Sequence, residues 1–228
     1  MFIRSLDLIL SSIALVTFLP LFLPVILILK VTGEGEIFFT QKRLGKNGKK
    51  FNLLKFATML KDSPNLGSKT VTLKNDSRVL PFGRFLRKTK LNETPQLLNV
   101  FFGNMSLIGP RPQDQRCFNA FPSSTKVSIK KVKPGLSGIG SIIFRCEDDL
   151  MSYAEDYDDF YDNVIMPYKG KLEEWFVENN TLKSYILLIF ITIWIVLSPS
   201  SRIIYMIFPN LPSPPDKLKH QLNYPNRK

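Results

Sequence analysis

One short stretch of the chain, residues 84–112, concentrates residue types that bind phosphate. Four cations precede the pair Asn92-Glu93, namely Arg84, Arg87, Lys88 and Lys90, and a Gly-Pro-Arg-Pro turn follows at 109–112. Guanidinium and ammonium groups bind phosphate oxygens, and a nearby carboxylate can hold a divalent cation. The stretch is therefore typical of a site for a phosphorylated substrate and a metal ion. Each feature alone is also common in solvated faces, helix caps and ordinary turns.

A helix is predicted to start at the Asn92-Glu93 pair. Its apolar residues recur at the spacing of one helical face and are Leu97, Leu98, Phe101 and Phe102. Asn92 is placed as the N-cap, Pro95 is tolerated in the first turn, and Gly103 ends the helix. The positive end of the helix dipole would then lie beside Glu93 and add to the anion-binding character.

Three strings of the sequence together resemble the bacterial sugar transferases, the monotopic phosphoglycosyl transferases that act on polyprenol phosphate. The strings are GEIFFTQKRLGKNGKKFNLLKFATM, RFLRKTKLNETPQLLNVFFGNMSLIGPRP and KPGLSGIGSIIFR. The resemblance covers about 7–145, and more loosely 172–197. It implies transfer of a sugar 1-phosphate from a UDP-sugar to undecaprenyl phosphate, with Mg²⁺. That reaction is the first membrane step in making bacterial lipopolysaccharide, capsule, exopolysaccharide or glycoprotein glycans.

The resemblance also implies roles for single residues. Glu93 would hold Mg²⁺ and take part in acid–base work, and Arg87 and Arg111 would offset phosphate charge. The remaining substrate-binding candidates are Pro110, Arg145, Lys55 and Arg84. At the position of Asn92 the family has an aspartate, which attacks the β-phosphate of the UDP-sugar and carries the phosphosugar.

Asn92 departs from that pattern, because an amide has no charge and is a poor nucleophile. Three explanations are open: a laboratory substitution, a natural branch that uses direct transfer or Glu93 as nucleophile, or an inactive relative that serves as a lipid-binding scaffold. Ala57 and Asn104 also replace charged residues of the family, which favours a natural branch. We therefore expect an active phosphoglycosyl transferase, with the inactive scaffold as the alternative.

Composition limits the partners. The 228 residues carry a formal charge of +12, and 44% of them are apolar, which predicts an anionic partner and excludes a disordered chain. Nucleic acid is not expected, because no binding motif is present and the cations adjoin membrane-type segments. The expected partners are the UDP-sugar, undecaprenyl phosphate and membrane lipids, with a homodimer as a further candidate. Cys117 and Cys146 are expected to be free thiols.

The N-terminal segment 2–29 is nearly all apolar. A straight helix of this length would reach about 42 Å, more than the roughly 30 Å hydrocarbon core, but Pro20 predicts a sharp break. The two halves, about 26 Å and 14 Å long, could not each cross a bilayer. We expect a re-entrant helix-break-helix, against the alternatives of a single span and a cleaved signal peptide. Basic residues after Lys30 predict that the body of the protein lies in the cytoplasm. The resemblance implies that the active site lies at the cytoplasmic face of the bacterial inner membrane.

The expected fold class is α+β, with a small cytoplasmic α/β catalytic domain. Segments 37–41 and 51–54 flank Asn47-Gly48 and predict a β-hairpin. Most hairpin cations are expected to contact anionic lipid headgroups, and they are Lys42, Arg43, Lys46, Lys49 and Lys50. Residues 80–83 are expected to open the helix that bears Arg84 and Arg87, and 141–144 to form a strand.

The C-terminal part is expected to be membrane-associated. The acidic segment 147–161 predicts a solvated amphipathic helix rather than a metal site. The apolar run 185–197 predicts an interfacial helix with Trp194 as an anchor, and the tail from Pro209 is expected to be frayed or to lie on the membrane. The expected division is a re-entrant helix at 1–31, a cytoplasmic transferase domain at 32–184, and an interfacial helix with a basic tail at 185–228.

Overall fold

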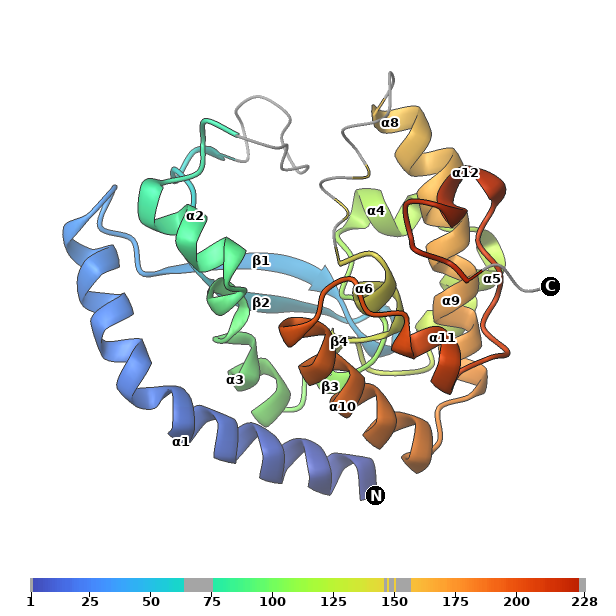
Figure 1. The fold of residues 1–228 in the computed structure, drawn as a ribbon. Helices are drawn as coiled ribbons and strands as arrows, with labels where there is room; N and C mark the ends of the chain where they lie inside the picture. The colour runs from blue at the N-terminus through green and yellow to red at the C-terminus, as the bar shows by residue number, and fades with distance from the viewer. Residues whose placement is uncertain (1, 64–75, 146, 148–149, 151–156, 226–228) are drawn as a thin grey trace.

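A long N-terminal helix arcs around one side of a body built from short helices and two small sheets (Figure 1). The structure is a computed structural model, and it describes residues 2–63, 76–145, 147, 150 and 157–225. Helices and strands are mixed along the chain, as the α+β prediction requires. Cys146 and most of the predicted acidic helix lie outside the described residues.

Helix α1 (Phe2–Val31) runs without interruption through Pro20 and Pro24. The predicted division into two helices at Pro20 is therefore wrong. Each proline removes one backbone donor, but the flanking turns stay helical, and the helix bends along its course (Figure 1). Its four buried residues lie toward its two ends and are Asp7, Ser11, Val25 and Leu29. Both ends pack on the body, whereas none of residues 12–24 is buried. By length and composition α1 could cross a membrane, and it is the one described helix that could.

The predicted β-hairpin is confirmed and is longer than expected. Strands β1 (Phe38–Leu44) and β2 (Lys50–Phe56) are antiparallel and are joined by the short 3-10 turn η1 (Lys46–Gly48). Opposed residues share a face, so the pairings Gln41↔Leu53 and Phe39↔Lys55 place Gln41, Arg43, Leu53 and Lys55 together.

The other face of the hairpin packs against two helices. Phe56 packs there with Val25 and Leu29 of α1 and with Leu86 of α2 (Pro81–Lys88). Pro81 opens α2, as predicted. Gly83 lies so close to Thr58 that a Cβ on it would stand 2.2 Å from the Thr58 carbonyl oxygen. The start of α2 is thus pressed directly onto the backbone that follows β2.

The central stretch forms a 3-10 turn, η3 (Leu91–Glu93), and then the six-residue helix α3 (Gln96–Phe101). Gly103, with φ +86°, ends this helix as predicted. Asn99 fixes α3 to the hairpin, because its Oδ1 accepts the Leu54 N–H at 3.0 Å and its Nδ2 donates to the Asn52 carbonyl at 2.8 Å. The turn that carries Glu93 is therefore attached to β2.

A second small sheet follows. Strands β3 (Ser106–Ile108) and β4 (Gly135–Ser137) are parallel, with Ser106 opposite Gly135 and Ile108 opposite Ser137. Helix α6 (Ile139–Ile143) comes next, so the strand predicted at 141–144 is wrong. A short apolar run fits a buried helix as well as a strand, and here its buried residues pack against the helices that follow.

The remaining helices build the largest core. Buried side chains of α9 (Met166–Glu178) and α10 (Leu182–Leu197) pack with those of α6 and of α11 (Ile203–Ile207). The tail also joins this core through buried Leu211, Leu218 and Leu222, and it contains α12 (Asp216–Lys219). The expectation of a frayed tail is therefore wrong for the described residues.

Helix α10 has an apolar surface on both sides. Tyr185, Leu188 and Ile191 face the core, while Phe190 and Trp194 are exposed. Trp194 donates its indole N–H to the Ser201 hydroxyl at 3.0 Å. The other short helices, which lie near α9 in Figure 1, are α4 (Gln115–Ala120), α5 (Ser123–Ile129), α8 (Tyr157–Phe160) and the π-helical turn η4 (Tyr161–Ile165).

Candidate active site

Three segments that are distant in the sequence meet at Glu93. The Lys55 ammonium, on β2, lies 3.0 Å from Glu93 Oε1. The guanidinium of Arg111, in the turn after β3, approaches the same oxygen at 3.4 Å. The side chains of Lys55 and Glu93 are each 18% exposed, and that of Arg111 is half-exposed. The structure therefore brings together three of the residues that the sequence points to.

The two cations keep Glu93 ionised. Burial by itself raises the pKa of Glu93, but Lys55 and Arg111 outweigh that effect and hold the pKa well below its usual range. In return, Glu93 raises the pKa of Arg111. Glu93 is therefore a carboxylate at any pH at which the protein would be assayed.

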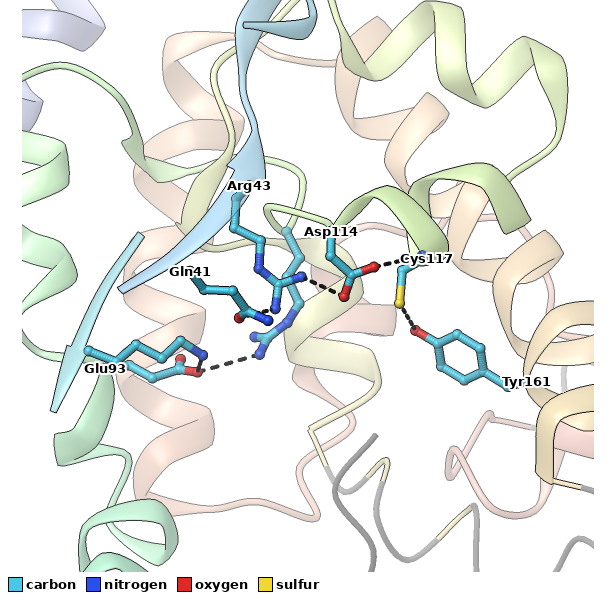
Figure 2. A network of polar contacts seen from close by, with 8 residues as sticks. Gln41, Arg43, Glu93, Asp114, Cys117 and Tyr161 are labelled. Carbon is cyan, nitrogen blue, oxygen red and sulfur yellow. Dashed lines mark hydrogen bonds and ion pairs between the residues drawn. The ribbon is translucent and has the colours of Figure 1, made fainter. Parts of the chain in front are cut away.

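A second polar network adjoins this cluster (Figure 2). Arg43 donates to Asp114 Oδ2 at 3.1 Å and to Gln41 Oε1 at 2.5 Å. Asp114 also caps α4, because its Oδ1 accepts the Cys117 N–H at 2.8 Å. Tyr161 donates its hydroxyl to Cys117 Sγ at 3.7 Å, and this contact joins η4 to the network.

Arg43 is a site residue that sequence reasoning missed. Its side chain is 15% exposed and paired, so it does not lie at lipid headgroups as most hairpin cations were expected to. The signal that could have found it is the hairpin register. Once Asn47-Gly48 fixes the turn, strand alternation places Arg43 on the face that carries Lys55.

A small pocket lies between the two networks. Its lining residues are Arg43, Leu53, Lys55, Glu93, Gln96, Arg111, Pro112 and Leu136. Three cations and one carboxylate give this lining a surplus of positive charge, of which Asp114, behind Arg43, offsets part. The remaining positive charge favours an anionic group such as a phosphate beside this lining.

Asn92 does not cap a helix. It lies inside the turn η3, α3 begins only at Gln96, and no side chain caps either element. The predicted N-cap is wrong because the chain makes a 3-10 turn through 91–93, so residue 92 does not precede the first helical turn. Asn92 is buried, and its Oδ1 has no hydrogen-bond partner among the described residues. With only six residues, α3 also gives little dipole for anion binding, so the cationic side chains carry that role.

The other predicted residues lie around this cluster. Arg87 contacts the sulfur of Met59 at 3.7 Å, and Arg84 is exposed on the same helix, α2. Pro110 precedes Arg111, and its carbonyl accepts the Gly135 N–H at 2.9 Å. Arg145 is half-buried in the turn after α6. The contacts described here do not bring Arg84, Arg87 or Arg145 to Glu93.

The comparison with known proteins decides the family. The sequence model of the bacterial sugar transferases matches residues 1–199. The chain belongs to the bacterial sugar transferases. Within the part of this sugar transferase that the structure describes, no group of three or more His, Cys, Asp and Glu side chains could hold a metal ion.

Curated relatives of this sugar transferase act in exopolysaccharide and undecaprenyl-phosphate chemistry, by their names. The exopolysaccharide production protein ExoY of Rhizobium meliloti (strain 1021) is 36% identical over 165 residues, which cover 66% of this chain and 71% of ExoY. The UDP-N-acetylgalactosamine-undecaprenyl-phosphate N-acetylgalactosaminephosphotransferase of Aeromonas hydrophila is 31% identical over 199 residues, 86% of this chain and 43% of that longer protein. The UDP-glucose:undecaprenyl-phosphate glucose-1-phosphate transferase of Klebsiella pneumoniae is 37% identical over 166 residues, 70% of this chain and 36% of that protein.

Proposed function

We propose that this sugar transferase moves a sugar 1-phosphate from a UDP-sugar to undecaprenyl phosphate, in the assembly of a bacterial surface polysaccharide. The observation that carries the proposal is the Glu93 carboxylate, held between Lys55 and Arg111 in a pocket with surplus positive charge. The names of the relatives from Aeromonas hydrophila and Klebsiella pneumoniae supply the donor class and the lipid acceptor.

The cations of the pocket would perform the electrostatic part of the reaction. A UDP-sugar and a lipid phosphate are both anions, so they repel each other unless positive groups lie between them. Lys55 and Arg111 are already positioned by Glu93, and Arg43 by Asp114, so little reorganisation is needed when phosphate binds. Preorganised charge of this kind stabilises the additional negative charge of a phosphoryl-transfer transition state.

We also propose that Mg²⁺ takes part. The residues fit such an ion, because Glu93 is an ionised carboxylate and the adjacent buried Asn92 Oδ1 has no partner among the described residues. Mg²⁺ is commonly bound by one or two such oxygens together with substrate phosphates. When bound, the ion would supply Lewis-acid stabilisation of phosphate charge.

The identity of residue 92 decides whether the phosphosugar can be transferred through a covalent enzyme intermediate or must pass directly to the lipid phosphate. Asn92 cannot form the covalent intermediate that an aspartate could, and Glu93 is engaged by two cations, which makes its carboxylate a weak nucleophile. We therefore favour direct transfer. An oxygen of undecaprenyl phosphate forms the bond to the β-phosphorus, the bond from that phosphorus to the bridging oxygen breaks, and UMP leaves.

The arc of α1 supports a re-entrant membrane attachment, and we propose that this attachment lies at the cytoplasmic face of the inner membrane. Asp7 near one end and Leu29 near the other are both buried against the same body, so a bilayer could not separate them. The middle of the helix exposes Ile13, Val16 and Leu19, which fit the hydrocarbon of one leaflet. Exposed apolar residues of α10 would lie at the interface and contact membrane lipids.

The test is transfer of radiolabelled sugar phosphate from a panel of UDP-sugars to undecaprenyl phosphate, with and without Mg²⁺. The parent should release UMP together with lipid product, EDTA should abolish turnover, and Glu93→Gln should lower the rate at least about 100-fold. Glu178→Gln, an exposed carboxylate on α9, is the matched control and should leave the rate unchanged.

Asn92→Asp distinguishes the route from the inactive alternative. Under direct transfer, the parent turns over, and mass spectrometry of the parent mixed with the UDP-sugar alone shows no phosphosugar adduct. An adduct on the parent would overturn the direct route. No turnover by the parent with any sugar, together with turnover by Asn92→Asp, would favour the lipid-binding scaffold.

A further inference from the structure

Asp7 is a carboxylate buried at the start of the membrane helix. It lies in the first two turns of α1 and is 2% exposed. Its Oδ1 accepts the Leu107 N–H at 2.9 Å and the Tyr185 hydroxyl at 2.5 Å, and the Ser106 hydroxyl lies 3.0 Å from both carboxylate oxygens. One side chain of α1 thus holds the beginning of β3 and the core helix α10.

Arg4, one turn earlier, holds a different segment. Its guanidinium donates to the carbonyls of Val100 and Phe101, at 2.6 Å and 2.7 Å. These carbonyls lie at the C-terminal end of α3, where carbonyls lack partners within the helix and where a cation is favourable. Arg4 therefore caps the C-terminal end of α3, whereas Glu93 lies before its N-terminal end.

Both anchored segments lead into the pocket. The chain runs from Ser106 and Leu107 through β3 to the turn that carries Arg111, while α3 follows directly on the turn that carries Glu93. The 3.4 Å contact between Arg111 and Glu93 thus joins two segments whose far ends are both held by α1. The first two turns of α1 therefore contact both the segment that leads to Arg111 and the helix that follows Glu93.

Fold stability alone is a weak reason for this arrangement. Burying a carboxylate costs free energy that its hydrogen bonds only partly offset, and apolar side chains in place of Asp7, Ser106 and Tyr185 together would fill the same space at no greater cost. Ser11, one turn further along and fully buried, illustrates the difference. Its hydroxyl donates within α1, to the Leu8 carbonyl.

We propose that Asp7, assisted by Arg4, is a positioning residue for phosphosugar transfer. It sets the placement of the Arg111 turn relative to Glu93 and ties that placement to the seating of α1 in the membrane. The inference rests on the proposed function, since the reaction it positions is the one proposed above. If this inference holds, the geometry of the pocket depends on α1, whose exposed middle faces lipid rather than substrate.

The first test needs no turnover. Hydrogen–deuterium exchange is measured on the full chain in lipid nanodiscs for the parent, Asp7→Ala, Asp7→Asn and the control Ser11→Ala. Asp7→Ala should raise exchange at least about tenfold in peptides spanning 105–113, with Asp7→Asn intermediate because its amide oxygen can still accept the Leu107 N–H. Peptides of α2, which packs on Phe56 and the C-terminal part of α1, should stay at the parent rate. Unchanged exchange at 105–113 would overturn the proposal, as would an equal increase in Ser11→Ala.

The second test asks whether Asp7 acts through Arg111. Asp7→Ala should lower kcat by between about 10- and 100-fold in the parent, with a smaller change in the KM for the UDP-sugar. In an Arg111→Lys background, where the fork geometry is already lost, the same change should cost less than about threefold. Equal losses in both backgrounds would show a general structural role and overturn the inference. No turnover by the parent would instead be a failure of the proposed function. The exchange measurement would then decide whether Asp7 positions the segment 105–113.

Discussion

Lys55 and Glu93 form an ion pair in which Nζ lies 3.0 Å from Oε1, with each side chain only 18% exposed. Removal of one partner leaves the other charge buried. We expect Lys55→Met to lower the free energy of unfolding by about 3 kcal/mol and the transfer rate at least about 100-fold. Thermal melting in detergent and the transfer assay measure the two effects.

The double variant Lys55→Met/Glu93→Gln separates stability from activity. It should recover most of the stability, because the one cation that then lacks its partner, Arg111, has a half-exposed side chain, and it should stay inactive. Lys61→Met is the matched control, since its pair with Glu36 is exposed, and it should change neither quantity. A double variant as unstable as Lys55→Met would show that the buried pair is not the cause.

Arg43 is expected to resist conservative replacement. Its guanidinium contacts Asp114 and Gln41 at once, and an ammonium group cannot span both partners. Arg43→Lys should therefore raise the KM for the UDP-sugar about tenfold, while Lys42→Arg, on the opposite face of the same strand, should not. Steady-state kinetics with the preferred sugar donor measure this, and a KM unchanged by Arg43→Lys would remove Arg43 from the site.

Glu173 predicts a pH dependence of stability. This α9 residue is buried, and its Oε2 has no hydrogen-bond partner among the described residues. Burial raises its pKa from 4.5 to about 8, although the Arg111 amide and Lys169 oppose the shift. Between these two values the folded protein keeps a proton that the unfolded chain has lost.

Stability should therefore fall as pH rises through that window. The stabilisation is complete below about pH 4.5, declines by about 1.4 kcal/mol per pH unit, and is lost above about pH 8. Glu173→Gln, which stays neutral, should remove this slope. Melting midpoints between pH 5.5 and 8.5 measure it, and parallel curves for the two proteins would contradict the assignment.

Gly83→Ala should displace α2. The added Cβ would stand 2.2 Å from the Thr58 carbonyl oxygen, and backbone cannot yield as a flexible side chain does. We expect a loss of about 1 to 3 kcal/mol in the free energy of unfolding. Lys88→Ala, an exposed change on the same helix, is the control and should stay within about 0.5 kcal/mol of the parent. Equal melting curves for Gly83→Ala and Lys88→Ala would show that α2 can shift freely.

Elements fixed by local backbone chemistry could be predicted from the sequence. Asn47-Gly48 takes positive φ at both positions and closes the hairpin, Pro81 opens α2, and Gly103 ends α3. Each depends on one or two residues whose allowed conformations are few. Their conformations could therefore be predicted without knowing the rest of the fold.

Features that depend on distant contacts could not be predicted in this way. The pairing of Arg43 with Asp114 spans 71 positions, and that of Lys55 with Glu93 spans 38. The resemblance pointed to Lys55 and Glu93 separately, but not to their contact. Residues 141–143 became part of helix α6 because the neighbouring helices α9 and α10 offer an apolar surface that either a helix or a strand could cover.

Glycine backbone lies in close contact where the parallel strands β3 and β4 run side by side. A Cβ on Gly135 would stand 2.1 Å from the Gly109 nitrogen, and one on Gly138 would stand 2.1 Å from the Gly109 oxygen. Neither position has the positive φ that usually demands glycine, so the requirement is one of space alone. In a saturation mutagenesis library these positions should therefore be as intolerant as Glu93, although they carry no reactive group, and alanine should be rejected there as firmly as tryptophan.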